Sequence, residues 1–65
     1  MKLIVNGEPV QTDRVVLADL LEQLGYGNIV VATAVNGSFV PVPRRNETSL
    51  EEGDKVEILA PMQGG

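Results

Sequence analysis

The sequence has no cysteine, no histidine and no tryptophan, and its only aromatic residues are Tyr26 and Phe39. These absences exclude disulfide bonds, the usual zinc sites, a thiol nucleophile and an imidazole base. They also exclude an aromatic platform on which single-stranded nucleic acid could stack. Small secreted domains are normally rich in paired cysteines, so a cytoplasmic protein is expected.

Basic residues are also few. Five Lys and Arg stand against nine Asp and Glu, which gives a net charge of −4 over 65 residues. Nucleic acids and anionic membranes prefer a basic surface, so neither is expected as a partner. The longest apolar run, Ile29 to Val35, is too short to span a membrane. The apolar start, Met1 to Val5, is too short for a signal peptide.

The first twelve residues predict a β-hairpin. Met1 to Val5 is rich in strand formers and ends at Asn6-Gly7, a pair typical of two-residue hairpin turns. Glu8 to Thr12 is expected to return as a second strand. Pro9 in this strand is compatible only with the edge of a sheet.

One amphipathic helix is expected next. Leu17, Leu20, Leu21 and Leu24 follow the i, i+3, i+4, i+7 spacing of a single apolar stripe. Gly25, directly after the stripe, suits a left-handed helix end. The start is less clear, because Val16 occupies the capping position. Asp13 is one candidate cap, and Asp19 reaching back to a free backbone N–H is another.

The second half of the chain predicts three more strands. Ile29 to Val35 has the composition of a strand buried on both faces. A second Asn-Gly pair at residues 36–37 leads into Ser38-Phe39-Val40, and the prolines that follow interrupt pairing. Arg44 to Leu50 is expected to be irregular or a short helical turn. After a turn at residues 52–54, Lys55 to Leu59 alternates polar and apolar side chains, as in a half-buried strand.

This order of elements predicts an α+β protein. One helix covers only one face of a sheet, and a parallel pair formed by the first and last strands would use the long connection between them as its crossover. A mixed sheet curled around one main helix is the β-grasp, or ubiquitin-like, fold. We therefore expect a single β-grasp domain over residues 1–60 and a flexible, projecting tail over residues 61–65.

The tail ends in Gly64-Gly65 and has two interpretations. A frayed end is the ordinary one for an arbitrary chain. Alternatively, two residues without a Cβ would let a narrow active site close around the terminal carboxylate. That carboxylate is ionised at neutral pH and reacts only after conversion to a better leaving group. No phosphate-binding loop or metal cluster in the sequence could perform this step, so another protein would have to activate it.

Four segments and the terminal Gly-Gly resemble the ThiS family, the small sulfur carriers of thiamin biosynthesis. The resemblance is co-linear and covers essentially the whole chain, through residues 1–7, 17–25, 34–41 with a gap at Ser38, and 50–58. It implies that an E1-like adenylyltransferase adenylates Gly65 with ATP, and that the acyl-adenylate becomes a thiocarboxylate with sulfur drawn from cysteine. Thiazole synthase would then receive the sulfur. The carrier itself would bind no cofactor.

The resemblance also implies roles for neighbouring residues. Gly64, Gln63 and Met62 would enter the active sites of partners, with Met62 as an adaptable recognition residue. The chain departs from the family at Val16, where relatives have Ser or Thr. It departs again at Pro41-Val42-Pro43-Arg44-Arg45, where a single proline followed by a basic residue is usual.

Other side chains have competing interpretations. Phe39 is a candidate partner contact or a core residue. The acidic residues at positions 51, 52 and 54 are better explained by a solvated turn than by a docking patch. Arg44 and Arg45 favour a solubilising loop over a contact with a nucleotide or an acidic partner. We also expect a sheet face with exposed apolar residues that leads toward the tail.

Three functions remain open from the sequence. The first is a thiocarboxylate sulfur carrier for thiamin. The second is the small subunit of molybdopterin synthase, which shares the fold and the Gly-Gly end but is usually longer and richer in aromatic residues. The third is a β-grasp binding module with an inert tail. An enzyme is not expected, because no nucleophile–base pair is present.

Overall fold

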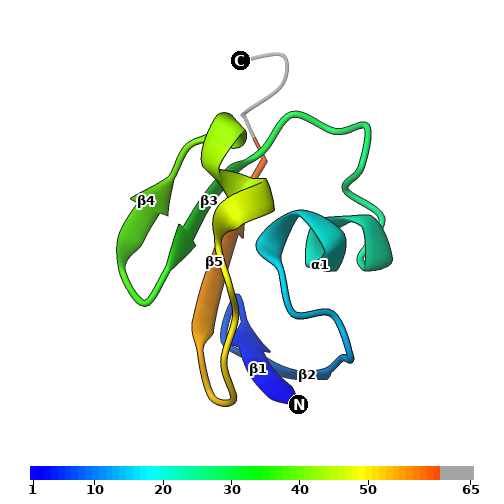
Figure 1. The fold of residues 1–65 in the computed structure, drawn as a ribbon, viewed down its shortest axis with the longest axis vertical. Coiled ribbons are helices and arrows are strands. Elements are labelled where there is room, and N and C mark those ends of the chain that lie inside the picture. Colours follow the sequence, from blue (N-terminus) through cyan, green and yellow to red (C-terminus); the bar gives the residue numbers. More distant parts are fainter. Residues whose placement is uncertain (61–65) are drawn as a thin grey trace.

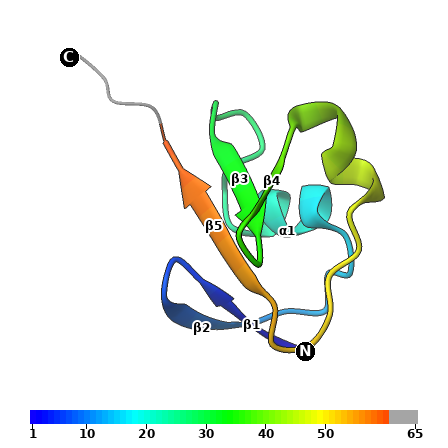
Figure 2. The ribbon, with the colours of Figure 1, turned by 90° about the vertical axis from the view of Figure 1, so that its left-hand side faces the viewer.

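Five strands form one mixed sheet in the computed structural model, which describes residues 1–60. The strands are β1 (Lys2–Val5), β2 (Glu8–Gln11), β3 (Ala32–Val35), β4 (Ser38–Val40) and β5 (Lys55–Leu59), in the spatial order β2-β1-β5-β3-β4. Helix α1 (Leu17–Gln23) and the 3₁₀ helix η1 (Val42–Glu47) complete the fold. Figure 1 shows both helices against one side of the sheet, and Figure 2, seen from the β4 edge, has β5 at the left and η1 at the right.

The topology confirms the expected α+β, β-grasp arrangement. β1 and β5 are parallel neighbours, with Ile4 opposite Lys55 and Val5 opposite Val56. β3 pairs antiparallel with the other side of β5, so the last strand lies in the middle of the sheet. β2 is an edge strand, which agrees with the interpretation of Pro9.

Both Asn-Gly pairs form two-residue hairpin turns. Asn6 and Gly7 have φ values of 50° and 84°, and Asn36 and Gly37 have 51° and 85°. The flanking pairs, Val5 with Glu8 and Val35 with Ser38, close directly around the turns. Positive φ at both central residues is what a type I′ turn requires, so the prediction from the sequence is confirmed.

Replacing Gly37 by Ala is therefore expected to destabilise the protein by about 1–2 kcal/mol. A Cβ at this position would meet no atom within 4 Å, so the cost comes from the left-handed backbone alone. Urea denaturation followed by circular dichroism measures the change. Ser38→Ala, at an exposed position beside the turn, is the control and should stay within about 0.5 kcal/mol of the wild type. Equal stability of Gly37→Ala and Ser38→Ala would contradict the turn assignment.

The leucine stripe of α1 supplies the centre of the core. Leu17, Leu20 and Leu21 are buried and cluster with apolar side chains from the inner face of the sheet. The buried core consists of Leu3, Val5, Leu17, Leu20, Leu21, Val31, Val40, Leu50, Val56 and Ile58. Leu24, the last residue of the stripe, is partly buried against this cluster.

The end of α1 and the capping position of Val16 were predicted correctly, but the two candidate capping side chains were not. Gly25 has a φ of 90°, and its N–H donates to Glu22 O while the N–H of Tyr26 donates to Leu21 O. This pair of bonds is a Schellman motif. At the other end no side chain caps the helix, so neither Asp13 nor Asp19 does so. The Leu17 N–H instead donates to the backbone oxygen of Thr48 at 2.9 Å.

The predicted strand over Ile29–Val35 is too long by three residues. β3 begins only at Ala32, and Val30 is 79% exposed. The N–H of Ile29 donates to Tyr26 O, which extends the turn after α1. The idea that this strand is buried on both faces is also wrong, because Ala32 on its outer side is exposed.

Candidate functional site

The predicted site at the C-terminus begins where the described chain ends. Gly65, Gly64, Gln63 and Met62 lie outside the described residues, as does the tail assigned to residues 61–65. The structure does describe β5, the strand that precedes this segment. β5 is held by β1 on one side and by β3 on the other, and its final pair joins Leu59 to Ala32.

β5 leads directly to Ala60, the last described residue. Figure 1 shows β5 running from the end of the molecule that holds Met1 to the opposite end. β1 pairs with the start of β5, and the Asn6 side chain bonds to the backbone of Ile58 farther along. β3 pairs with β5 as far as Leu59, so Ala60, the root of the tail, directly follows a paired residue. A central strand is a rigid support for a reactive group.

An apolar surface lies on the outer side of the sheet next to this root. Phe39 is 68% exposed and Leu59 is 69% exposed, so Phe39 belongs to the surface and not to the core. Ala34 pairs with Phe39, and Ala32 pairs with Leu59. We call Ala32, Ala34, Phe39 and Leu59 the outer-face patch. They line a shallow hollow of about 130 Å³ together with Thr33 and Glu57.

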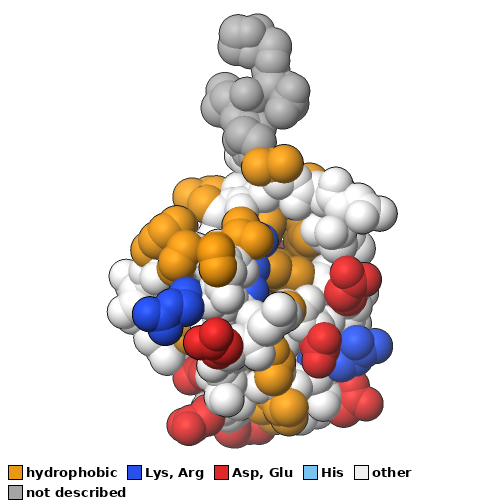
Figure 3. Space-filling view, turned by 45° about the horizontal axis from the view of Figure 1, so that its top comes forward, with side chains coloured by type: hydrophobic (Ala, Val, Ile, Leu, Met, Phe, Trp, Pro, Cys, Tyr) orange, Lys and Arg blue, Asp and Glu red, His pale blue; other side chains and the backbone are white. Residues whose placement is uncertain are grey.

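This patch agrees with the expected sheet face that leads toward the tail. Large exposed apolar side chains grouped beside one another are typical of interaction sites in soluble proteins. Figure 3 looks at the opposite side of the molecule, the one that carries the helices, where further hydrophobic side chains gather in the upper part of the view; the outer face of the sheet is turned away from the viewer there.

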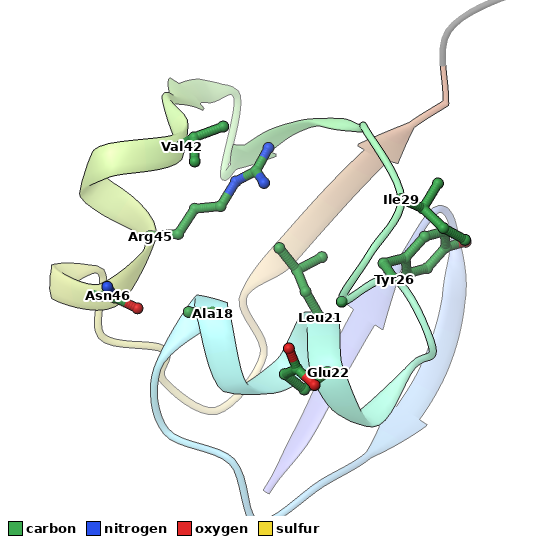
Figure 4. Close-up of a pocket in the computed structure, with 9 residues that line it drawn as sticks. Ala18, Leu21, Glu22, Tyr26, Ile29, Val42, Arg45 and Asn46 are labelled. Carbon is green, nitrogen blue, oxygen red and sulfur yellow. The ribbon is translucent and has the colours of Figure 1, made fainter.

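A second hollow lies on the helix side, between α1, the segment that follows it, and η1. It has a volume of about 210 Å³. Exposed Ile29 and Val42 stand at its rim, and Arg45 reaches across it from η1 toward β3 (Figure 4). The other residues that line it are Ala18, Leu21, Glu22, Tyr26, Gly27 and Asn46.

Arg45 is committed to hydrogen bonds within the fold. Its Nε donates to Thr33 Oγ1 at 3.1 Å, and its Nη2 donates to the backbone oxygen of Val31. Thr33 Oγ1 in turn donates to the backbone oxygen of Val40 at 2.8 Å. Arg45 thus ties η1 to β3 and β4, which corrects its interpretation as part of a solubilising loop. Arg44 fits that interpretation, because its side chain is exposed.

Arg45→Ala is expected to lower the free energy of unfolding by about 2 kcal/mol. The substitution removes two charge-assisted hydrogen bonds and leaves the buried Thr33 hydroxyl with one partner fewer. Arg44→Ala is the matched control and should cost less than about 0.5 kcal/mol, since its 3.8 Å ion pair with Glu47 is exposed. Urea denaturation of both variants distinguishes a structural arginine from a surface one. Equal effects would contradict the assignment.

The acidic turn before β5 has a structural role. Asp54 Oδ2 accepts from the N–H of Glu51 at 2.8 Å, and Asp54 Oδ1 accepts from Asn36 Nδ2 at 3.0 Å. Glu52 Oε1 accepts from the N–H of Lys2 at 3.0 Å. These bonds support the prediction of a solvated turn.

Residues 1–60 hold no other obvious chemical site. Within them, no three His, Cys, Asp or Glu side chains come together in a group that could hold a metal ion. None of the helices in this part of the chain has the length and apolar character needed to cross a membrane.

Comparisons with known proteins identify a family and solved structures that have the same fold. The family model for ThiS proteins matches residues 3–65, which includes the terminal glycines. The crystal structure of a thiamine biosynthesis protein, ThiS, from Geobacter metallireducens is 32% identical to this chain. That similarity covers 100% of both chains, with a TM-score of 0.84.

A solution structure of a thiamine biosynthesis protein from the same organism is also 32% identical, with a TM-score of 0.81. It covers 100% of this chain and 88% of that one. No curated protein sequence matches the chain significantly. The resemblance drawn from the sequence is confirmed.

Proposed function

The chain belongs to the ThiS family, the sulfur carriers of thiamine biosynthesis, and we propose that its Gly65 carboxylate is the group that carries the sulfur. The observation that supports this most directly is the extent of the family match, which runs through Gly65. The described structure also fits this role, because β5, the strand that precedes the tail, is the central strand of the sheet.

The proposed reaction has two steps, both performed by partner enzymes. A carboxylate oxygen of Gly65 attacks the α-phosphorus of ATP, which forms an acyl-adenylate and releases pyrophosphate. Hydrosulfide, whose sulfur comes ultimately from cysteine, then attacks the carbonyl carbon, expels AMP and loses its proton. The product is a terminal thiocarboxylate, whose sulfur thiazole synthase takes up. The carrier holds no cofactor of its own, and ATP is a substrate of the activating enzyme.

The tail residues have proposed roles that follow from their size. Gly64 has no Cβ, so it allows a narrow channel to close around the backbone beside the reactive carbon. Gln63 and Met62 would enter the same channel, and the outer-face patch, with Phe39, would rest on the surface around its mouth. We place the carrier in the cytoplasm, where ATP is supplied.

Two partners must use the carrier in turn, the E1-like adenylyltransferase and thiazole synthase. The outer-face patch suits such transient docking, because it is apolar, modest in size and directly joined to the tail through Leu59. Neither nucleic acid nor a membrane is needed at any step.

A transfer experiment tests the proposed acceptor. The thiocarboxylated chain is mixed, in separate single-turnover reactions, with thiazole synthase and its substrates and with the large subunit of molybdopterin synthase and its precursor. We expect loss of the thiocarboxylate and formation of thiazole phosphate in the first reaction only. Sulfur transfer in the second reaction alone would mean that the chain supplies sulfur for molybdopterin and not for thiamin. A thiocarboxylate that neither enzyme consumes would contradict both assignments.

A further inference from the structure

Glu57 occupies the centre of the outer face of the sheet. It lies on β5 between Val56 and Ile58, both of which are buried, so its own side chain is on the opposite, exposed face. Its direct neighbour in the register is Ala34 of β3. Glu57 lines the hollow of the outer-face patch and also a second hollow next to it, of about 390 Å³, which includes Ile4 and Lys55.

Within the described residues, this carboxylate has no cationic partner. The ion pairs among residues 1–60 join Arg14 to Asp13 and Arg44 to Glu47, and neither includes Glu57. Lys55 is two residues away on the same face, but no ion pair joins it to Glu57. Glu57 is therefore an unpaired charge among the exposed apolar side chains of the outer-face patch.

A protein that covers Phe39 and Leu59 must cover Glu57 as well, because all three line the same hollow. Removing an unpaired carboxylate from water opposes binding strongly unless the partner supplies a cation or equivalent hydrogen-bond donors. We propose that the outer face selects a protein partner that presents an apolar surface with a basic side chain, preferably arginine, opposite Glu57.

The occupant we assign is the enzyme that activates the terminal carboxylate, so this inference rests on the proposed function. Residues 61–65 span at most about 18 Å when fully extended. The active site that receives Gly65 must lie within that reach of Ala60, and Leu59 of the outer-face patch directly precedes Ala60. An enzyme so close to the root of the tail has the outer face within its footprint.

The test measures the affinity of the E1-like adenylyltransferase of the same organism, by isothermal titration, for the wild type and three variants. Glu57→Lys should weaken binding by at least about 100-fold, because it places two cations against each other. Glu57→Gln should weaken binding by about 10-fold. The control is Glu8→Lys at an exposed position of edge strand β2. It makes the same change in net charge, from −4 to −2, and should stay within about threefold of the wild type.

Thermal unfolding of all three variants should match the wild type, which excludes misfolding as the cause. Binding of Glu57→Lys within threefold of Glu8→Lys, or absence of binding by the wild type, would overturn the inference. A fourth variant, Phe39→Ala, distinguishes the two parts of the inference. If Phe39→Ala binds weakly while Glu57→Lys binds normally, the outer face is an interface but the opposing cation is absent, and the charge assignment is wrong.

The binding results for Glu57 can be distinguished from a failure of the proposed function at Gly65. A wild-type chain that acquires sulfur while Glu57→Lys binds normally would overturn only this inference. A wild-type chain that binds the enzyme and never acquires sulfur, while Glu57→Lys binds poorly, would support the interface and overturn the sulfur-carrier chemistry at Gly65.

Discussion

A chain extended by one alanine after Gly65 is expected to lose ATP-dependent adenylation by at least about 100-fold. One added residue moves the terminal carboxylate by about 3.3–3.6 Å. In-line attack on the α-phosphorus of ATP depends on placement to within about 1 Å, and misplacement on that scale costs roughly 100-fold. Deletion of Gly65 shifts the carboxylate by the same distance in the other direction and should have a similar effect. Exchange of labelled pyrophosphate into ATP, catalysed by the E1-like partner, measures the loss.

Folding provides the control for these end variants. All core residues lie before Ala60, so the far-UV circular dichroism and the thermal transition should be unchanged. Wild-type exchange rates in the extended chain would contradict the assignment of the terminal carboxylate as the reacting group. An internal carboxylate, or no carboxylate of this chain, would then be the substrate.

Leu20→Ala is expected to remove a large part of the stability of the protein. Leu20 is 0% exposed and lies at the centre of the core. Loss of a buried leucine side chain costs about 2–5 kcal/mol, whereas a domain of this size has roughly 3–10 kcal/mol in total. We therefore expect a substantial unfolded fraction at the growth temperature and a clear fall in the urea midpoint.

Leu24→Ala is the matched control for this substitution. Leu24 continues the same stripe but is only partly buried beyond the end of α1, so its loss should cost about 1 kcal/mol. Equal effects of the two substitutions would contradict the packing of α1 that the structure shows.

Features set by local sequence were predictable. The two Asn-Gly turns follow from the φ values that a type I′ turn requires, and the Schellman end of α1 follows from Gly25. The parallel pairing of β1 with β5 was also predictable, because these are the most regular apolar strands and the chain between them is long enough for a crossover. The edge position of the strand that contains Pro9 was predictable because proline has no N–H to donate to a neighbouring strand.

Features set by distant contacts were not predictable. The run from Ile29 to Val31 has strand composition, yet Val31 O accepts from Arg45, which is 14 residues away in the sequence. The first N–H of α1 is satisfied by the backbone of Thr48, and no local pattern reports that contact. Glu57 was missed as a candidate contact because alternation predicts only that it faces outward. Its apolar neighbours come from β3 and β4.

Intact-protein mass spectrometry shows whether sulfur is loaded on the carboxylate of Gly65. The wild-type chain is incubated with the E1-like adenylyltransferase, ATP and a cysteine-derived sulfur source, and the modified form is fragmented to locate the change. We expect a gain equal to the mass of sulfur minus that of one oxygen, mapped to Gly65 and dependent on ATP. A chain that stays unmodified while every other component is active, or a sulfur located at another residue, would contradict this expectation.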